Sequence, residues 1–314
     1  MRFLMAYARF FTPEMCERFR RLGLEPVFLP GENGQPGDEE RTYDMDFSDI
    51  DAVLCYRFFC HNDIARFPKL KYIHTTSSGI DHMPLDYIRD HGIVLCNARG
   101  VYSAPMAEFA LSAVLQLYKA APLFYEQQRA HVWKLHDTLR ELAGRQVTIV
   151  GAGSVGTECA KRFSAMGCRC VGLCRHPDDS AAHYAAQRSI TRLDALLPET
   201  DILLLTVPLT GDTRGLMDAR RFALLKDGAV LVNIARGPVV DAGAMLAALR
   251  SGRLSGAAVD VVDPEPLPPD DPLWDAPNLI LTPHNSFIGD GDAQRMFELV
   301  YQDTETWLNG GITK

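Results

Sequence analysis

The feature that most constrains the fold of this 314-residue chain is a glycine-rich segment near its middle. The apolar run 146–150 leads directly into the hexapeptide GAGSVG, and a helical pattern follows it. A strand that turns at glycines into a helix is typical of a dinucleotide-binding βαβ unit. The first glycine permits the tight turn, the second lets a pyrophosphate approach the backbone, and the third lets the helix pack on the strand. The residues expected to contact the dinucleotide are Gly151, Gly153, Ser154, Val155 and Gly156.

Apolar runs that suit strands alternate with helical patterns along almost the whole chain. This alternation is typical of parallel sheets with crossover helices, and the length exceeds the roughly 250–300 residues at which single cores stop growing. We therefore predict an α/β fold with two doubly wound parallel-sheet domains. Helical patterns cover 103 to about 125 and 287 to about 308, and 31–38 has the composition of a surface loop. The expected strands are 2–8, 52–57, 72–75, 94–97, 147–150, 170–174, 202–207, 230–234, 257–261 and 279–282.

Charge and composition argue against several classes of partner. The formal net charge is -8 and the basic residues form no run, which argues against nucleic acid. No segment approaches the roughly 18–20 apolar residues of a membrane span, and the apolar N-terminal stretch is too short for a signal peptide. We therefore expect a cytoplasmic protein that does not bind membranes. The eight cysteines include no CxxC pair and no Cys/His cluster at zinc spacing, so we expect free thiols and no metal.

The end of the strand after the glycine-rich helix predicts which cofactor binds. A site specific for NAD places Asp or Glu there to accept a hydrogen bond from the ribose 2′-hydroxyl. This chain has Cys174 at that position, followed by Arg175, and a cation there pairs with a 2′-phosphate. We therefore expect NADP as the cofactor. The alternative is NAD, with Arg175 directed to solvent and Asp178 or Asp179 supplying the acidic group.

Three further motifs lie at the carboxyl ends of predicted strands, the edge where open α/β sheets bind ligands. They are NIARGPVVD with Arg236, AVDVVDPEPLP with Asp260 and Glu265, and LTPHNS with His284. Hydride transfer to a ketone leaves charge on the carbonyl oxygen, which then takes a proton from an acid such as His. A carboxylate bonded to that His orients it and favours its protonated form. An Arg fixes the carboxylate of the substrate and polarises its carbonyl.

Each of these residues also has a simpler interpretation. His284 follows a proline and can be a structural histidine, while Arg236 can bind a loop carbonyl. Glu265 can be a solvated residue of a Pro-rich loop, and Asp260 can cap a turn. Trp133 falls in the predicted helical segment before the glycine-rich strand, where we expect an interface or core aromatic, or a side chain that reaches a neighbouring subunit's active site.

Taken in order, GAGSVG, NIARGPVVD, AVDVVDPEPLP and LTPHNS resemble the motifs of the D-isomer-specific 2-hydroxyacid dehydrogenase family. TTSSGIDHM and NARGVYSAPMAEFAL resemble its substrate-loop and hinge regions, so the resemblance covers nearly the whole chain. It implies that His284 donates or accepts the proton, that Glu265 orients it, and that Arg236 binds the substrate. It also implies that Asp260 contacts the nicotinamide side of the cofactor. Backbone amides of Ser77, Ser78 and Gly79 would hold the substrate carboxylate, and Val207, Pro208 and Ala235 are further expected cofactor contacts.

The resemblance also implies a domain organisation. Residues 1–100 and 287–314 would form a flavodoxin-like substrate domain, and residues 101–286 a Rossmann dinucleotide domain inserted into it. Family members are usually dimers joined through the inserted domain, so a homodimer is expected.

The expected activity is reduction of a small 2-oxo acid to its D-2-hydroxy acid. The basic ribose corner is similar to that of the NADP-preferring glyoxylate and hydroxypyruvate reductases, which makes these two acids the leading substrates. Two alternatives remain at this point. One is a nucleotide-sensing, corepressor-like binding protein on the same fold. The other is a relative that acts on a different small acid or an oxyanion such as phosphite or formate.

Overall fold

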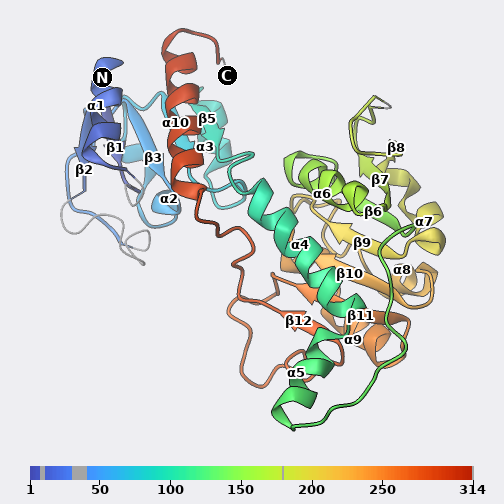
Figure 1. Ribbon diagram of the computed structural model, residues 1–314. Helices are drawn as coiled ribbons and strands as arrows, with labels where there is room; N and C mark the ends of the chain where they lie inside the picture. The colour runs from blue at the N-terminus through green and yellow to red at the C-terminus, as the bar shows by residue number, and fades with distance from the viewer. Residues whose placement is uncertain (8–10, 30–40, 179, 313–314) are drawn as a thin grey trace. The chain divides into compact units, whose positions relative to one another are not determined.

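The computed structural model describes residues 1–7, 11–29, 41–178 and 180–312 (Figure 1). The chain divides into two compact units. Met1–Tyr102 with Gly289–Lys314 is called the terminal unit below, and Ser103–Ile288 the central unit. The expected domain ranges differ from these units by two residues at each boundary (100 against 102, and 287 against 289). The surface loop expected at 31–38 lies outside the described residues.

The terminal unit is built on a parallel five-stranded sheet in the order β2-β1-β3-β4-β5. This is the flavodoxin-like order of doubly wound sheets. Helices α1 and α10 cover one face, where Phe19 and Phe297 pack edge to face, and α2 and α3 cover the other. The strands are β1 Arg2–Met5, β2 Glu25–Phe28, β3 Ala52–Cys55, β4 Tyr72–Thr75 and β5 Val94–Asn97. The helices are α1 Pro13–Arg21, α2 Phe58–His61, η2 Ile64–Arg66, α3 Leu85–Asp90 and α10 Asp292–Leu308.

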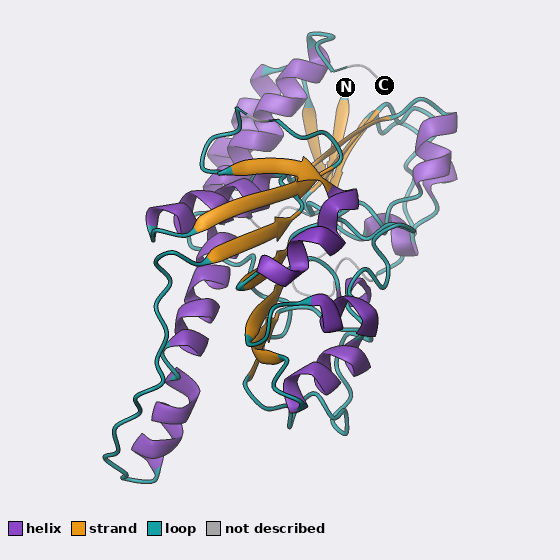
Figure 2. Cartoon of the chain, turned by 90° about the vertical axis from the view of Figure 1, so that its right-hand side faces the viewer, coloured by secondary structure: helices purple, strands orange, loops and turns teal. Residues whose placement is uncertain are grey.

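The central unit is built on a parallel seven-stranded sheet in the order β12-β11-β10-β9-β6-β7-β8. Figure 2 shows the strands of the chain in orange and the helices in purple. The strand order reverses between β6 and β9, which is the point where doubly wound sheets bind ligands. The strands are β6 Gln146–Val150, β7 Arg169–Cys174, β8 Ala186–Ser189, β9 Ile202–Leu205, β10 Ala229–Asn233, β11 Leu254–Val259 and β12 Leu279–Leu281.

Helices cover both faces of this second sheet. Small residues such as Ala107 and Ala110 bring α4 close to one face beside α6, while α8 and α9 pack on the other. The helices are α4 Ser103–Tyr118, α5 Ala121–Arg129, α6 Ser154–Ala165, η3 Ile190–Arg192, α7 Leu193–Leu196, η4 Leu197–Glu199, α8 Ala219–Leu224, η5 Gly237–Val239 and α9 Ala242–Arg250. Two parallel-sheet α/β units confirm the predicted fold class.

Several details of the predicted secondary structure are wrong, including the start of the last helix, which is Asp292 and not residue 287. The helix expected from 103 to about 125 is two helices, because Pro122 lacks an N–H and crowds the carbonyl four residues earlier, and Ala120 takes a φ of 51° between them. The short edge strands β2 and β8 carry polar residues or proline and were not expected. Trp133 lies outside any helix and its side chain is 104% exposed, so it is not a core residue of this chain.

No helix in the described ranges is both long enough and apolar enough to span a bilayer.

Candidate active site

The glycine-rich turn joins β6 to α6 and has three different local environments. A Cβ on Gly151 (φ 109°) would lie 2.8 Å from the Thr206 backbone, and one on Gly156 would lie 2.1 Å from the Gly151 oxygen. Only glycine permits these two close approaches. Gly153, by contrast, has no atom within 4 Å of an added Cβ. This open space lies at the start of α6, where the N–H groups of Ser154 and Val155 have no partner within the helix, so a pyrophosphate fits here.

The turn 174–178 at the end of β7, where the ribose is expected, is called the ribose corner. A residue from the neighbouring strand closes it. Gln187 on β8 accepts hydrogen bonds at Oε1 from the Cys174 thiol (3.4 Å) and from the Asp178 N–H (3.0 Å). The Asp178 carboxylate accepts bonds from the Ser180 N–H and hydroxyl within its own turn. Arg175 is exposed in the turn between Cys174 and Asp178. Asp179, the other acidic candidate, lies outside the described residues.

The other expected cofactor residues follow β9 and β10, whose ends meet the end of β6 at one edge of the sheet. Val207 and Ala235 are buried there, and the Pro208 carbonyl accepts a bond from the Thr213 hydroxyl at 2.6 Å. Thr206 also caps the glycine turn, because its hydroxyl donates to the Gly151 oxygen at 2.7 Å. The first of these bonds holds the loop after β9 in shape, and the second holds the start of that loop against the glycine-rich turn.

His284 and Glu265 form a hydrogen-bonded pair beyond the ends of β11 and β12. The distance from His284 Nδ1 to Glu265 Oε2 is 2.7 Å, and Glu265 Oε1 accepts the Val262 N–H at 3.1 Å. Within the described residues, His284 Nε2 makes no hydrogen bond, and the side chain is 40% exposed. Glu265 therefore holds the imidazole at Nδ1, and Nε2 has no partner among the described residues.

The ionisation of Glu265 is set by opposing effects. Partial burial acts to raise the pKa of this carboxyl group. The hydrogen bond and charge of His284, the Val262 N–H and the charge of Arg236 outweigh that effect and leave the pKa below its ordinary value. Glu265 is therefore an anion at neutral pH.

Asp260 holds the loop that carries His284. Its carboxylate is 1% exposed and accepts bonds from the Thr282 hydroxyl (2.7 Å), the Asn285 N–H (2.9 Å) and the Ser286 N–H (2.9 Å). The His284 N–H bonds to the Asp260 carbonyl at 2.7 Å, and His284 takes a left-handed φ of 53°. Asp260 thus stabilises the unusual backbone that aims the imidazole. Its expected contact with the nicotinamide remains a prediction.

Arg236 follows β10 in a loop pressed against the Glu265 loop. A Cβ on Gly237 would lie 2.0 Å from the Val262 oxygen, so only glycine allows this approach. The buried Asn233 side chain donates to the Arg236 carbonyl (3.1 Å) and accepts from the Ala235 N–H (3.1 Å), which fixes the start of the loop. The structure therefore brings Arg236, Glu265 and His284 together in the central unit.

The terminal unit carries residues 77–79, which the sequence predicts to hold the substrate carboxylate and which are called the substrate loop below. The Ser78 hydroxyl donates to the Ala98 carbonyl at 3.0 Å, and Asn97 Nδ2 donates to the Ser78 carbonyl at 2.8 Å. The Ser77 hydroxyl donates to the Gly79 carbonyl at 2.7 Å. Within the described residues, the N–H groups of Ser78 and Gly79 donate no hydrogen bond. The loop is therefore braced by residues 97 and 98, while these two N–H groups have no partner among the described residues.

Sequence reasoning missed two residues that organise these sites. Asn97 braces the substrate loop, and Gln187 closes the ribose corner. The only sequence signal was the position of Asn97 inside the hinge-like NARG segment. Gln187 lies on a strand that was not predicted.

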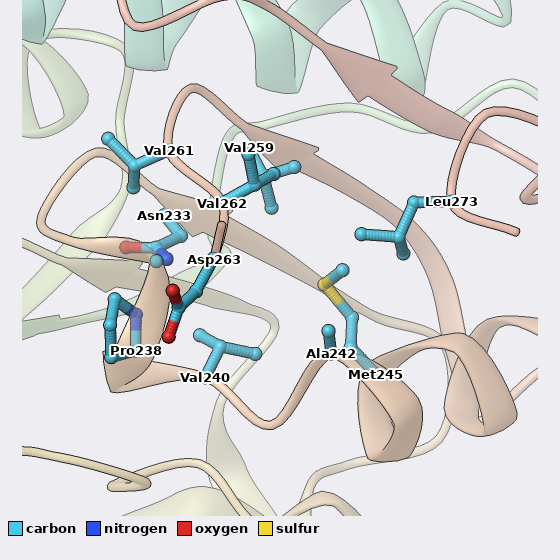
Figure 3. A pocket seen from close by; sticks show the side chains of 11 residues that line it. Asn233, Pro238, Val240, Ala242, Met245, Val259, Val261, Val262, Asp263 and Leu273 are labelled. Carbon is cyan, nitrogen blue, oxygen red and sulfur yellow. The ribbon is translucent and has the colours of Figure 1, made fainter. Parts of the chain in front are cut away.

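A cavity of about 170 Å³ lies against the loops that follow β10 and β11 (Figure 3). Apolar side chains dominate its wall, and Arg236, Glu265 and His284 do not line it. Its lining therefore does not include these three predicted site residues. The residues around it are Asn233, Gly237, Pro238, Val240, Ala242, Met245, Val259, Val261, Val262, Asp263 and Leu273.

The fold and the glycine-rich turn define a dinucleotide-binding α/β protein, and comparison with known proteins narrows this class. Residues 111–286 match the model of the D-isomer specific 2-hydroxyacid dehydrogenase NAD binding domain. A glyoxylate reductase of Thermofilum pendens is 34% identical over 248 residues, which cover 77% of this chain and 73% of the relative. A glyoxylate reductase/hydroxypyruvate reductase of Mus musculus is 34% identical over 68% of this chain and 67% of its own length.

A solved structure is similar to this chain over its whole length. The NADPH-dependent glyoxylate/hydroxypyruvate reductase of Sinorhizobium meliloti, in complex with NADP and sulfate, has a TM-score of 0.79 and 27% identity. The match covers 100% of this chain and 96% of that one. The chain belongs to the D-isomer specific 2-hydroxyacid dehydrogenase family, and it is an NAD(P)-dependent enzyme of that family.

Proposed function

We propose that this enzyme reduces a small 2-oxo acid to the D-2-hydroxy acid, with His284 as the proton donor. The observation that carries the proposal is the His284–Glu265 pair, in which Nδ1 is held at 2.7 Å and Nε2 is left for a substrate. Arg236 lies near enough for its charge to lower the pKa of Glu265, so the three groups form one electrostatic unit.

The chemistry assigns a separate task to each group. The bound nicotinamide supplies the hydride that reduces C2 of the substrate. His284 Nε2 gives a proton to the oxygen on which charge develops, and takes it back in the reverse direction. The Glu265 anion holds the imidazole at Nδ1 and fixes its orientation. Arg236 pairs with the substrate carboxylate and polarises the carbonyl. For the terminal unit, taken by itself, we propose that the N–H groups of Ser78 and Gly79 bind a carboxylate.

We propose NADP as the preferred cofactor and NAD as the alternative. Cys174 occupies the strand end where an NAD site places an acid, and Arg175 follows it with a positive charge. Asp178 binds its own turn instead of replacing that acid. The Sinorhizobium meliloti relative binds NADP, and relatives carry the names glyoxylate reductase and hydroxypyruvate reductase. Glyoxylate and hydroxypyruvate are therefore the substrates to test first.

We further propose a homodimer in the cytoplasm. Residues 130–143, called the arm below, hold exposed apolar side chains that a monomer would leave in water. Arg140 ties the end of the arm to the central unit through the Gly228 carbonyl and the Ser255 hydroxyl. All eight cysteines are free thiols, as in a reducing compartment. The exposed apolar residues of the arm are Val132, Trp133, Leu135 and Leu139.

The test is an absorbance assay of reduced nicotinamide with a panel of small 2-oxo acids. We expect rapid oxidation of NADPH with glyoxylate or hydroxypyruvate, slower oxidation of NADH, and chiral analysis showing the D product. Absence of turnover with every acid, although the cofactor binds, would contradict the proposed reaction. Light scattering during gel filtration measures the assembly, and a mass of one chain would contradict the dimer.

A further inference from the structure

We propose that Gln187 sets the choice between NADP and NAD, although it lies outside the glycine-rich motif and on a different strand from Cys174 and Arg175. This inference rests on the proposed function, because it takes the ribose corner of the central unit as the cofactor site.

The strand register places Gln187 beside the ribose corner. Strand β8 runs parallel to β7 at the edge of the sheet (Figure 1). The register places Gln187 opposite Gly172 and Ser189 opposite Cys174. Side chains of paired residues share a face, and so do those two positions apart on one strand. Gln187 and Cys174 therefore lie on the same face of the sheet. The amide oxygen of Gln187 reaches the Cys174 thiol on this face.

The amide oxygen of Gln187 ties together both ends of the turn that carries Arg175. It accepts the Cys174 thiol at 3.4 Å on one side and the Asp178 N–H at 3.0 Å on the other. Gln187 is only 6% exposed, so these bonds are largely shielded from water. The turn is short and closed, and Arg175 projects from it into solvent at the carboxyl edge of the sheet. Gln187 is therefore a positioning residue for that cation.

The neutrality of Gln187 matters as much as its hydrogen bonds. A glutamate at this position would keep the two donors, which favour its ionised form. Its negative charge would then stand within hydrogen-bond distance of Cys174, the place where an NAD site holds its acid. A phosphate monoester carries a charge of about -1.5 to -2, so that anion would repel the 2′-phosphate of NADP and accept a bond from the 2′-hydroxyl of NAD. The neutral amide of Gln187 adds no charge to the ribose corner, so the positive charge of Arg175 is not opposed there.

The experiment measures the Kd of NADP⁺ and of NAD⁺ for the full chain by calorimetry. The variants are Gln187→Glu, Gln187→Met and the control Gln302→Glu, which adds the same charge on the exposed surface of α10. For Gln187→Glu we expect the Kd ratio of NADP⁺ to NAD⁺ to rise about tenfold or more, as for a like charge placed near the phosphate. For Gln187→Met, which only releases the turn, we expect NADP⁺ alone to weaken, by about threefold. Gln302→Glu should change neither value.

The outcomes separate this inference from the proposed function. If Gln187→Glu is folded, by its melting temperature, and keeps the wild-type ratio, the role of Gln187 is wrong while the proposed function stands. The same holds if both variants weaken the two cofactors equally, because that result indicates only a structural role. If Gln187→Glu does not fold, an unchanged ratio in Gln187→Met overturns the inference. If the wild-type chain binds neither cofactor, the proposed function itself fails.

Discussion

The two units place different chemistry at the carboxyl edges of similar parallel sheets. The central unit presents side chains, since Arg236, Glu265 and His284 extend from loops that follow its strands. The terminal unit presents main-chain N–H groups at Ser78 and Gly79, held by bonds to neighbouring backbone. One sheet therefore carries a titratable His–Glu pair beside an arginine, and the other carries backbone N–H groups that donate no hydrogen bond within the described residues. The same architecture supports either task, because the task depends on the loops at the strand ends.

The substitution with the largest expected effect tests His284, the proposed proton donor in the central unit. His284→Ala removes the acid and should lower kcat by about 10²–10⁴-fold, as is typical when a general acid is lost. Cofactor Kd should stay within about twofold, because the glycine-rich turn is untouched. The matched control is His91→Ala at the end of α3, which should keep wild-type turnover. Near-normal kcat in His284→Ala would remove the distinction between the two units.

Asp260→Asn tests whether the buried carboxylate works through the His284 loop. An amide offers one acceptor oxygen where the carboxylate accepts three bonds, so at least one loop donor loses its partner. We expect kcat to fall by about 10–100-fold and the free energy of unfolding by about 1–3 kcal/mol. Steady-state kinetics and denaturant unfolding measure the two effects. A loss of stability with unchanged kcat would show that the loop does not aim His284.

Asn97→Ala tests the brace of the substrate loop in the terminal unit. Without the bond from Asn97 to the Ser78 carbonyl, the amides of the loop are less well ordered for the substrate carboxylate. KM for the 2-oxo acid should rise about tenfold, equivalent to one lost interaction, with kcat and cofactor affinity nearly unchanged. Asn309→Ala at the end of α10 is the control. If kcat falls and KM does not change, the terminal unit acts on the chemical step instead.

The substitution with the smallest expected effect is at the amino ends of the strands of the central sheet, at the other edge from Arg236, Glu265 and His284. Asp201 bonds to Lys226 Nζ (2.7 Å) and the Gln146 N–H (2.9 Å), and its side chain is 13% exposed. Burial acts to raise the pKa of Asp201, but Lys226, the Gln146 N–H and Arg145 outweigh it and leave the pKa lowered. Asp201→Asn should therefore lower the free energy of unfolding by about 1–2 kcal/mol at pH 7 and leave kcat unchanged.

The pH dependence of this effect follows from the sign of the shift. A pKa lowered in the folded state means that the unfolded chain binds the proton more readily. The stabilisation is complete above the unfolded value of about 3.9 and is lost as the pH falls through the folded value. The difference between Asp201→Asn and wild type should shrink below about pH 4 in urea titrations. Asp227→Asn, in an exposed pair, is the control, and an equal effect there would contradict the role of burial.

Edge elements show where secondary structure could not be predicted from local pattern. The central strands of both sheets read as apolar runs because they are buried on both faces. Strands β2 and β8 are polar or contain proline, and only pairing with β1 and β7 makes them strands. The break between α4 and α5 was visible in Pro122, but small residues around it continued the helical pattern.

The sequence alone determined the class of protein and predicted three side chains that the structure brings close together. Gly151, Gly153 and Gly156 encode a local backbone shape, and Arg236, Glu265 and His284 follow buried strands whose ends meet by the rule of parallel sheets. Only the tertiary structure decided that Asp260 holds the His284 loop, that Asn97 braces the substrate loop, and that Gln187 closes the ribose corner. The physical reason is that each of these bonds joins residues from different strands or loops. Their energies depend on register and burial, which no local pattern encodes.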